Sequence, residues 1–202
     1  MVIKVYLFDF DDTIISTKIY AELYQPLLKM IKSKLKLTDS QLNQKAEGLG
    51  LTKNKFGRWD TGDLCRELNL LEEYYQVLEK QIKVMPVLHN TVISVFKKIK
   101  AKKKKIAVVS NSMRRTVNAY LHKYELDKYL DFTFTRDDAQ CKKSDDAFWQ
   151  KLIKKQKLNP KGCLVIGDDP EQDGAIPEKF GFNTLVIKGP QDLKKVSQKV
   201  LL

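Results

Sequence analysis

Short apolar runs that alternate with helical patterns constrain the fold of this 202-residue chain more than any other feature. From residue 106 onward, four runs of a length typical of buried strands are separated by stretches with helical periodicity, including 113–124 and 147–156. The four runs are 106–109, 132–135, 163–166 and 183–187, and a fifth run at 3–8 opens the chain. This order is typical of a parallel sheet with helices on both faces. We therefore expect a Rossmann-like α/β fold.

The stretch 9–105, between the first two strand-like runs, is far longer than one crossover helix requires. Its patterns are helical throughout, and both Thr38 and Asp60 precede typical helix starts. The helical stretches are 18–36, 39–49 and 68–84, and a further one at 91–99 fits better with the sheet. We expect residues 16–85 to form an inserted all-helical domain, and residues 1–15 and 86–202 to form the α/β core domain.

The composition is that of a globular protein with an excess of positive charge. The chain has 37 Lys plus Arg against 25 Asp plus Glu, a net charge of +12, and Arg occurs only five times. Lysine is a common surface solubiliser, whereas arginine is favoured for bidentate phosphate recognition, so nucleic acid is the less favoured partner. No apolar stretch approaches the roughly 20 residues of a spanning helix, and the three cysteines form no metal-binding pattern. We expect a cytoplasmic protein that does not enter membranes.

Two clusters of acidic residues follow strand-like runs. Asp9 and Asp11 come directly after the run at 3–8, and Asp168, Asp169 and Asp173 come after the run at 163–166. Ligands of open parallel sheets bind at the carboxyl ends of the strands, so these carboxylates converge if the two strands are neighbours. An all-oxygen donor set favours Mg²⁺ over zinc, since no histidine or cysteine pair lies near these strand ends.

Two further segments supply groups suited to binding a phosphoryl group. Ser110, Asn111 and Ser112 end the run at 106–109, and Lys142 and Lys143 precede a helical stretch. A hydroxyl, backbone N–H groups and an ammonium together can cradle a phosphate. Ser110 alone is equally consistent with an N-cap of the following helix.

These four motifs, in this order, resemble the haloacid dehalogenase (HAD) superfamily of phosphohydrolases. Asp9, Asp11 and Thr13 match the DxDxT motif of this family, and Ser110 matches its second motif. The fourth motif has a GDDxxxD form in this family, which is matched by Gly167, Asp168, Asp169 and Asp173. Counting back from the run at 163–166 favours Lys143 over Lys142 as the third-motif lysine. Asp12 stands where many members have glycine. The inserted helical domain resembles the C1-type cap of this family.

The resemblance implies a role for each of these residues. Asp9 would be the nucleophile that forms an aspartyl-phosphate, and Asp11 would be the general acid and base. Ser110, the Asn111 amide and Lys143 would hold the phosphoryl oxygens. Mg²⁺ would be bound by the Asp9 and Asp168 carboxylates and by the Asp11 backbone carbonyl. Asp173 would also hold the ion, and both Asp173 and Asp169 would act directly or through water.

The implied function is a Mg²⁺-dependent phosphatase acting on a small phosphorylated metabolite such as a nucleotide or sugar phosphate. A sugar phosphomutase would use the same residues. A different alternative is a basic protein that binds nucleic acid or an acidic partner through the lysine-rich segment 97–105. In the helical insert, the loop 53–60 either presents Lys55, Arg58 or Trp59 to a substrate, or connects two helices with Trp59 packed inward.

Overall fold

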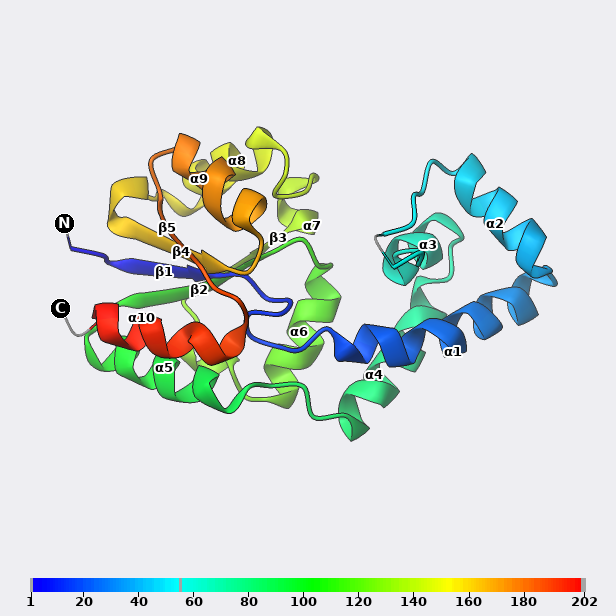
Figure 1. The fold of residues 1–202 in the computed structure, drawn as a ribbon, viewed down its shortest axis with the longest axis horizontal. Helices are drawn as coiled ribbons and strands as arrows, with labels where there is room; N and C mark the ends of the chain where they lie inside the picture. The colour runs from blue at the N-terminus through cyan, green and yellow to red at the C-terminus, as the bar shows by residue number, and fades with distance from the viewer. Residues whose placement is uncertain (1, 55, 201–202) are drawn as a thin grey trace. The chain divides into compact units, whose positions relative to one another are not determined.

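A computed structural model describes residues 2–54 and 56–200 of the chain, which divides into two compact units. The core unit comprises Met1–Thr17 and Val87–Leu202, and the inserted unit comprises Lys18–Pro86. The boundaries expected from the sequence were 15/16 and 85/86. Each unit has its own set of elements (Figure 1).

The core unit contains a five-stranded parallel sheet with the strand order β3-β2-β1-β4-β5. The strands are β1 (Val5–Phe8), β2 (Lys105–Ser110), β3 (Phe132–Thr135), β4 (Cys163–Gly167) and β5 (Asn183–Val186). In the central strand, Phe8 lies between Val108 of β2 and Ile166 of β4, so the three strands end side by side. The predicted α/β fold is confirmed.

Helices cover both faces of this sheet (Figure 1). They are α5 (Asn90–Ala101), α6 (Arg114–Lys123), α7 (Arg136–Ala139), α8 (Asp146–Gln156), α9 (Ile176–Lys179) and α10 (Leu193–Val200). Alternate residues of β1 face opposite sides, as the pleat requires. Leu7 shares a buried cluster with Trp149 of α8, whereas the Phe8 ring lies 5.0 Å from that of Phe96 in α5. The sheet is therefore buried on both sides.

The inserted unit is helical throughout its regular elements. These are α1 (Lys18–Leu35), α2 (Asp39–Gly48), α3 (Thr61–Glu67) and α4 (Leu71–Val84). Both expected helix starts are confirmed, because Thr38 forms a capping box with Gln41 and Asp60 accepts hydrogen bonds from the first turn of α3. The expected helix at 68–84 begins later, at Leu71. Asn69 takes a positive φ of 56°, which interrupts the helical path between α3 and α4.

The loop between α2 and α3 packs its tryptophan inward. This agrees with the interpretation that the loop connects two helices, rather than with the one in which Trp59 faces a substrate. Trp59 is buried, and its indole Nε1 donates a hydrogen bond of 3.1 Å to Asn43. Arg58 lies over the ring of Tyr24, and Lys55 lies outside the described residues. Trp59 therefore serves the packing of the inserted unit.

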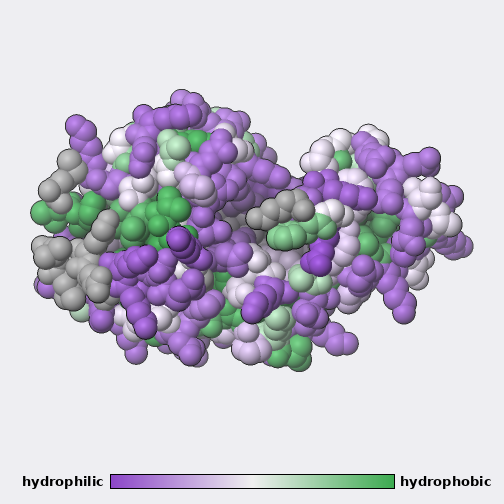
Figure 2. Space-filling model, viewed as in Figure 1, coloured by the Kyte–Doolittle hydropathy of each residue, from purple (hydrophilic) through white to green (hydrophobic). Residues whose placement is uncertain are grey.

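Hydrophilic residues cover most of the face seen in Figure 2. Among the described residues, we find no helix with the length and apolar character that crossing a bilayer requires.

Candidate active site

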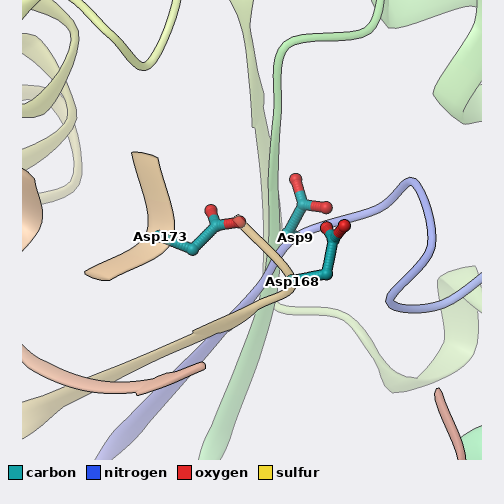
Figure 3. A group of neighbouring side chains, drawn as sticks. All are labelled: Asp9, Asp168 and Asp173. Atoms are coloured by element: carbon teal, nitrogen blue, oxygen red, sulfur yellow. The ribbon is translucent and has the colours of Figure 1, made fainter. Parts of the chain in front are cut away.

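Three carboxylates gather at the carboxyl ends of β1 and β4. Asp9 follows β1, Asp168 follows β4, and Asp173 lies in the π-helical turn Pro170–Ala175. Because β1 and β4 are neighbours, one oxygen of each residue lies within 4.8 Å of the others (Figure 3). The side chains of Asp9 and Asp173 are buried, and Asp168 is exposed. The expected convergence of the two acidic clusters is present in the structure.

Lys143 places an ammonium group among these carboxylates. Its Nζ donates to Asp9 Oδ1 and, at 2.6 Å, to Asp173 Oδ1, and its side chain is only 3% exposed. Lys142, the alternative considered from the sequence, is exposed. The buried Trp149 of α8 donates from Nε1 to the Lys143 carbonyl at 2.9 Å, which ties the lysine backbone to the core. Of the two lysines, the structure brings Lys143 into the cluster.

Burial and charge crowding shift the pKa values of this cluster. Burial raises the pKa of Asp9 well above its usual range, and Asp173 and Asp11 add to the rise while Lys143 opposes it. Asp168 is exposed as a residue, but the surrounding pocket wall partly dehydrates its carboxylate; this loss of hydration, and then the neighbouring Asp173 and Asp12, raise its pKa to about 6. Burial alone would lower the pKa of Lys143, but Asp9 and Asp173 raise it instead. The lysine therefore stays an ammonium, and its single charge does not balance the carboxylates.

Gly167, the last residue of β4, makes the approach of Asp173 possible. A Cβ at Gly167 would lie 2.1 Å from Asp173 Oδ2 and 2.6 Å from its Cβ, far closer than real contacts allow. Only glycine fits here without displacing the carboxylate.

The segment after β2 contacts the segment after β1 through Ser112. The Ser112 hydroxyl donates to Asp11 Oδ2 at 2.7 Å, and its backbone N–H donates to Ser110 Oγ at 2.9 Å. Ser110 is fully buried, and α6 begins after Met113, so Ser110 is not the N-cap of that helix. The structure therefore places Asp11 beside the loop that follows β2, where Ser112 contacts both Asp11 and Ser110.

Asn111 and Asp169 make side-chain contacts that the sequence did not predict. Asn111 Oδ1 accepts a 2.7 Å hydrogen bond from the Lys143 backbone N–H, and its Nδ2 donates to Gln172 Oε1 at 2.8 Å. The Asp169 carboxylate accepts the backbone N–H groups of Glu171 and Gln172, so it caps the turn that carries Asp173. Asp169 is not part of the three-carboxylate cluster found among the described residues.

Asp12 ties the end of the first motif to the chain that leads toward the inserted unit. It takes a positive φ of 51°, and its carboxylate accepts the Thr17 backbone N–H at 2.9 Å and the Thr17 hydroxyl at 2.7 Å. A glycine would reach this conformation more easily but would lack both bonds. The presence of Asp at this position thus has a local structural reason.

These side chains line one pocket of the core unit. Its lining residues are Asp9, Asp11, Asp12, Asn111, Lys143, Asp168, Asp169, Gln172 and Asp173. Every one of them carries a carboxylate, an amide or an ammonium. Ser110 is not among them, although it directly precedes Asn111.

The donor set fits a hard divalent cation. The three clustered ligand atoms are all carboxylate oxygens, which Mg²⁺ and Ca²⁺ prefer, and nothing soft or nitrogenous lies among the described lining residues except Lys143 and two side-chain amides. Loss of hydration is the main cause of the raised pKa values of Asp9 and Asp168, and neighbouring carboxylates add to it; a bound cation would offset both effects.

Comparison with protein families shows which family this chain belongs to. Residues 6–187, most of the chain, match the model of the haloacid dehalogenase-like hydrolases. The chain belongs to this family. Among curated proteins, a sequence search finds no match.

Several solved structures share the HAD fold over nearly the whole chain. A HAD phosphatase from Thermococcus onnurineus is 18% identical, with 96% of this chain and 97% of that chain covered and a TM-score of 0.74. YfnB from Bacillus subtilis, provisionally described as a HAD-hydrolase and bound to magnesium, is 15% identical with both chains fully covered and a TM-score of 0.66. A protein from Thermotoga maritima, provisionally described as a beta-phosphoglucomutase, is 14% identical over 98% of this chain and all of its own, with a TM-score of 0.66.

The sequence did not predict the contacts that three residues make in this site. Gln172 was visible within the second acidic cluster but carried no motif signal, and its partner Asn111 is 61 positions away. Ser112 follows the end of β2, and nothing in its sequence pattern indicates its contact with Asp11. The role of Gly167 as space for Asp173 depends on the π-helical turn, which the sequence pattern did not indicate.

Proposed function

We propose that this HAD-family hydrolase is a Mg²⁺-dependent phosphatase that cleaves a small phosphorylated metabolite through an aspartyl-phosphate. The observation that carries the proposal is the contact of Asp9 with the Lys143 ammonium, inside a cluster of carboxylates at the ends of β1 and β4. A carboxylate held by an ammonium beside a cation site is poised to meet an anionic phosphoryl group. Sugar phosphates and nucleotides are the substrate classes we favour.

In the first step, a carboxylate oxygen of Asp9 forms a bond to phosphorus while the bond from phosphorus to the leaving oxygen breaks. Asp11 donates a proton to that oxygen, so an alcohol departs. Ser112, which donates to Asp11 Oδ2, holds the carboxyl group in place. In the second step, Asp11 takes a proton from water as the water oxygen attacks phosphorus, and Asp9 is released with inorganic phosphate.

The remaining residues would bind and orient the phosphoryl group. Lys143 provides a charge that stays positive, because its pKa is raised by the flanking carboxylates. The Asn111 backbone N–H and the Ser110 hydroxyl at the end of β2 would complete the set of donors. Asp9, Asp168 and Asp173, together with the Asp11 carbonyl, would hold Mg²⁺. When bound, the ion would neutralise charge on the transferring phosphoryl oxygens.

A sugar phosphomutase is the second candidate, because it needs the same groups and one structural neighbour is provisionally described as a phosphoglucomutase. The two activities differ in the fate of phosphate. The inserted helical unit, which we propose is a C1-type cap that selects the substrate, would serve either one. A cytoplasmic location stays a prediction from the sequence.

The test is a panel of phosphorylated metabolites incubated with the protein and Mg²⁺, in which both released phosphate and isomerised product are measured. A phosphatase releases phosphate in proportion to substrate consumed, and a chelator abolishes the release. Isomerisation with little phosphate would assign a mutase instead. No turnover of any phosphomonoester would contradict both candidates.

A further inference from the structure

A chain of side-chain amides joins three segments of the candidate site. Gln172, in the turn that carries Asp173, bonds to Asn111 after β2, and Asn111 bonds to the backbone of Lys143 before α8. The two links span 61 and 32 positions of the sequence. The chain therefore connects parts of the molecule that local structure alone would not align.

The chemistry of the chain fixes which way each amide points. Gln172 Nε2 donates to Asp169 Oδ2 at 3.0 Å, and an ionised carboxylate can only accept. The Gln172 Oε1 atom must then face Asn111 and accept from its Nδ2. Asn111 is left with Oδ1 directed at the Lys143 backbone N–H. Each amide thus has one defined orientation, set by the carboxylate at the start of the chain.

Gln172 itself is held at both ends. Its backbone N–H donates to Asp169 Oδ1 at 2.9 Å, so the Asp169 carboxylate accepts hydrogen bonds from both the main chain and the side chain of Gln172. The Gln172 side chain is half-buried in the pocket wall. It therefore has little freedom to leave Asn111.

We propose that Gln172 is a positioning residue, which orients the Asn111 amide and through it the main chain that presents the Lys143 ammonium to Asp9 and Asp173. The inference rests on the proposed phosphatase function. Gln172 need not touch the reacting atoms, because it acts on the placement of the two residues that bind the phosphoryl group. In metal sites, loss of a hydrogen bond that orients a ligand lowers metal affinity or activity about 10- to 100-fold, and we expect an effect at the lower end of this range here.

A double-mutant cycle tests this role. Gln172→Met keeps the length of the side chain but removes both amide contacts, and Asn111→Ala removes the middle of the chain. We expect each single variant to lower kcat/KM for a phosphomonoester about tenfold. The double variant should be no worse than Asn111→Ala alone, because one break already disconnects Lys143 from Asp169. Gln172→Ala, which adds no bulk, should behave like Gln172→Met.

Two further measurements separate positioning from general stability. Inorganic phosphate, used as a competitive inhibitor with Mg²⁺ present, should bind more weakly to the Gln172 variants, while their thermal unfolding temperature stays near that of the wild type. Gln150→Met, on the exposed side of α8, is the matched control and should change neither quantity.

The outcomes are distinct. An active wild type whose Gln172→Met and Gln172→Ala variants stay within twofold of it would overturn the inference alone. If the fold losses in kcat/KM of the two single variants multiplied in the double variant, the inference would also be overturned, because Gln172 would then not act through Asn111. A wild type without phosphatase or mutase activity would overturn the proposed function and this inference with it.

Discussion

At Gly167, the space of one methyl group determines whether Asp173 can join the carboxylate cluster. The Cβ of any other residue would overlap the Asp173 carboxylate. We expect Gly167→Ala to push this carboxylate away and to lower Mg²⁺-dependent turnover about 100-fold, since small displacements of catalytic groups have effects of this size. Turnover as a function of Mg²⁺ concentration measures the change. Gly162→Ala, where a Cβ would enter open space, is the control and should remain active. Equal activity of the two variants would contradict this account of the site.

Lys143 balances part of the negative charge that folding buries. Replacing it with methionine leaves Asp9 and Asp173 buried without their ammonium partner. We expect Lys143→Met to lower the free energy of unfolding by about 3 kcal/mol in the absence of metal. Saturating Mg²⁺ should recover part of the loss, because the cation supplies the missing positive charge. Urea unfolding with and without Mg²⁺ checks this, with the exposed Lys142→Met as control. If both variants were as stable as the wild type, the buried pairs would be unimportant.

At the scale of elements, Asp138 joins a strand and two helices. Its carboxylate accepts the Thr135 backbone N–H at 2.8 Å at the end of β3, Lys155 Nζ of α8 at 2.8 Å, and the guanidinium of Arg114 in α6. Burial alone would raise the pKa of Asp138, but these partners lower it to about 2. The carboxylate thus links three elements that surround the β3 edge of the sheet.

The lowered pKa gives this link a defined pH dependence. Because the folded-state pKa lies below the ordinary value of 3.8, the stabilisation is fully present above about pH 4 and is lost as the pH falls toward 2. Asp138→Asn should lower the free energy of unfolding by about 1 kcal/mol at pH 7, a modest value because Arg114 and Lys155 are partly exposed and screened by solvent. Urea unfolding should show a smaller difference at pH 3 than at pH 7. A difference that grows on acidification would contradict the assignment.

The elements that sequence could predict were those with strong local signals. The apolar runs indicated all five strands, and side-chain caps at Thr38 and Asp60 indicated two helix starts. The four-residue α7 was not predicted, since it depends on a capping box between Thr135 and Asp138 rather than on an amphipathic pattern. The break at Asn69 was missed because a positive φ leaves little trace in the sequence.

The candidate site was predictable where it depends on strand ends. Asp9 and Asp168 each follow a strand, so the sequence predicted that they would lie together if these strands were neighbours, as β1 and β4 are. Spacing along the sequence favoured Lys143 over the adjacent Lys142, and in the structure Lys143 is the buried one of the two. The Asn111–Gln172 contact depends on packing between distant segments, so no local sequence pattern predicts it.

At the scale of the whole core unit, the carboxylate cluster and the lysine-rich segment 97–105 lie at opposite ends of the sheet. The carboxylate cluster follows β1 and β4, whereas Lys4 precedes β1 and Lys105 is the first residue of β2, with the Lys105 backbone N–H bonded to the Lys4 carbonyl at 2.9 Å. The lysine-rich segment 97–105 ends α5 and begins β2. Lysines at a helix C-terminus interact favourably with the helix dipole, so this segment has a structural role apart from any partner.

This separation predicts that the lysine-rich segment contributes little to catalysis. The triple change Lys102→Gln, Lys103→Gln and Lys104→Gln lowers the net charge from +12 to +9, a difference of three charges. A four-residue strand spans roughly 13 Å, which exceeds the Debye length of about 8 Å at physiological salt. We expect kcat/KM at this ionic strength to stay within about twofold of the wild type. A much larger loss would show that the segment takes part in substrate binding.

The most direct test of the central claim is Mg²⁺-dependent phosphate release by the wild type and by Asp9→Asn. The variant should stay folded, because it removes a buried carboxylate whose pKa is raised by loss of hydration and by the nearby Asp173 and Asp11, while Lys143 keeps Asp173 as its partner. Asp145→Asn is the matched control, since Asp145 is exposed and asparagine also serves as an N-cap of α8. We predict that Asp9→Asn lowers phosphate release about 1,000-fold or more while the control retains it. Retained turnover in a folded Asp9→Asn protein would contradict the assignment of Asp9 as the nucleophile.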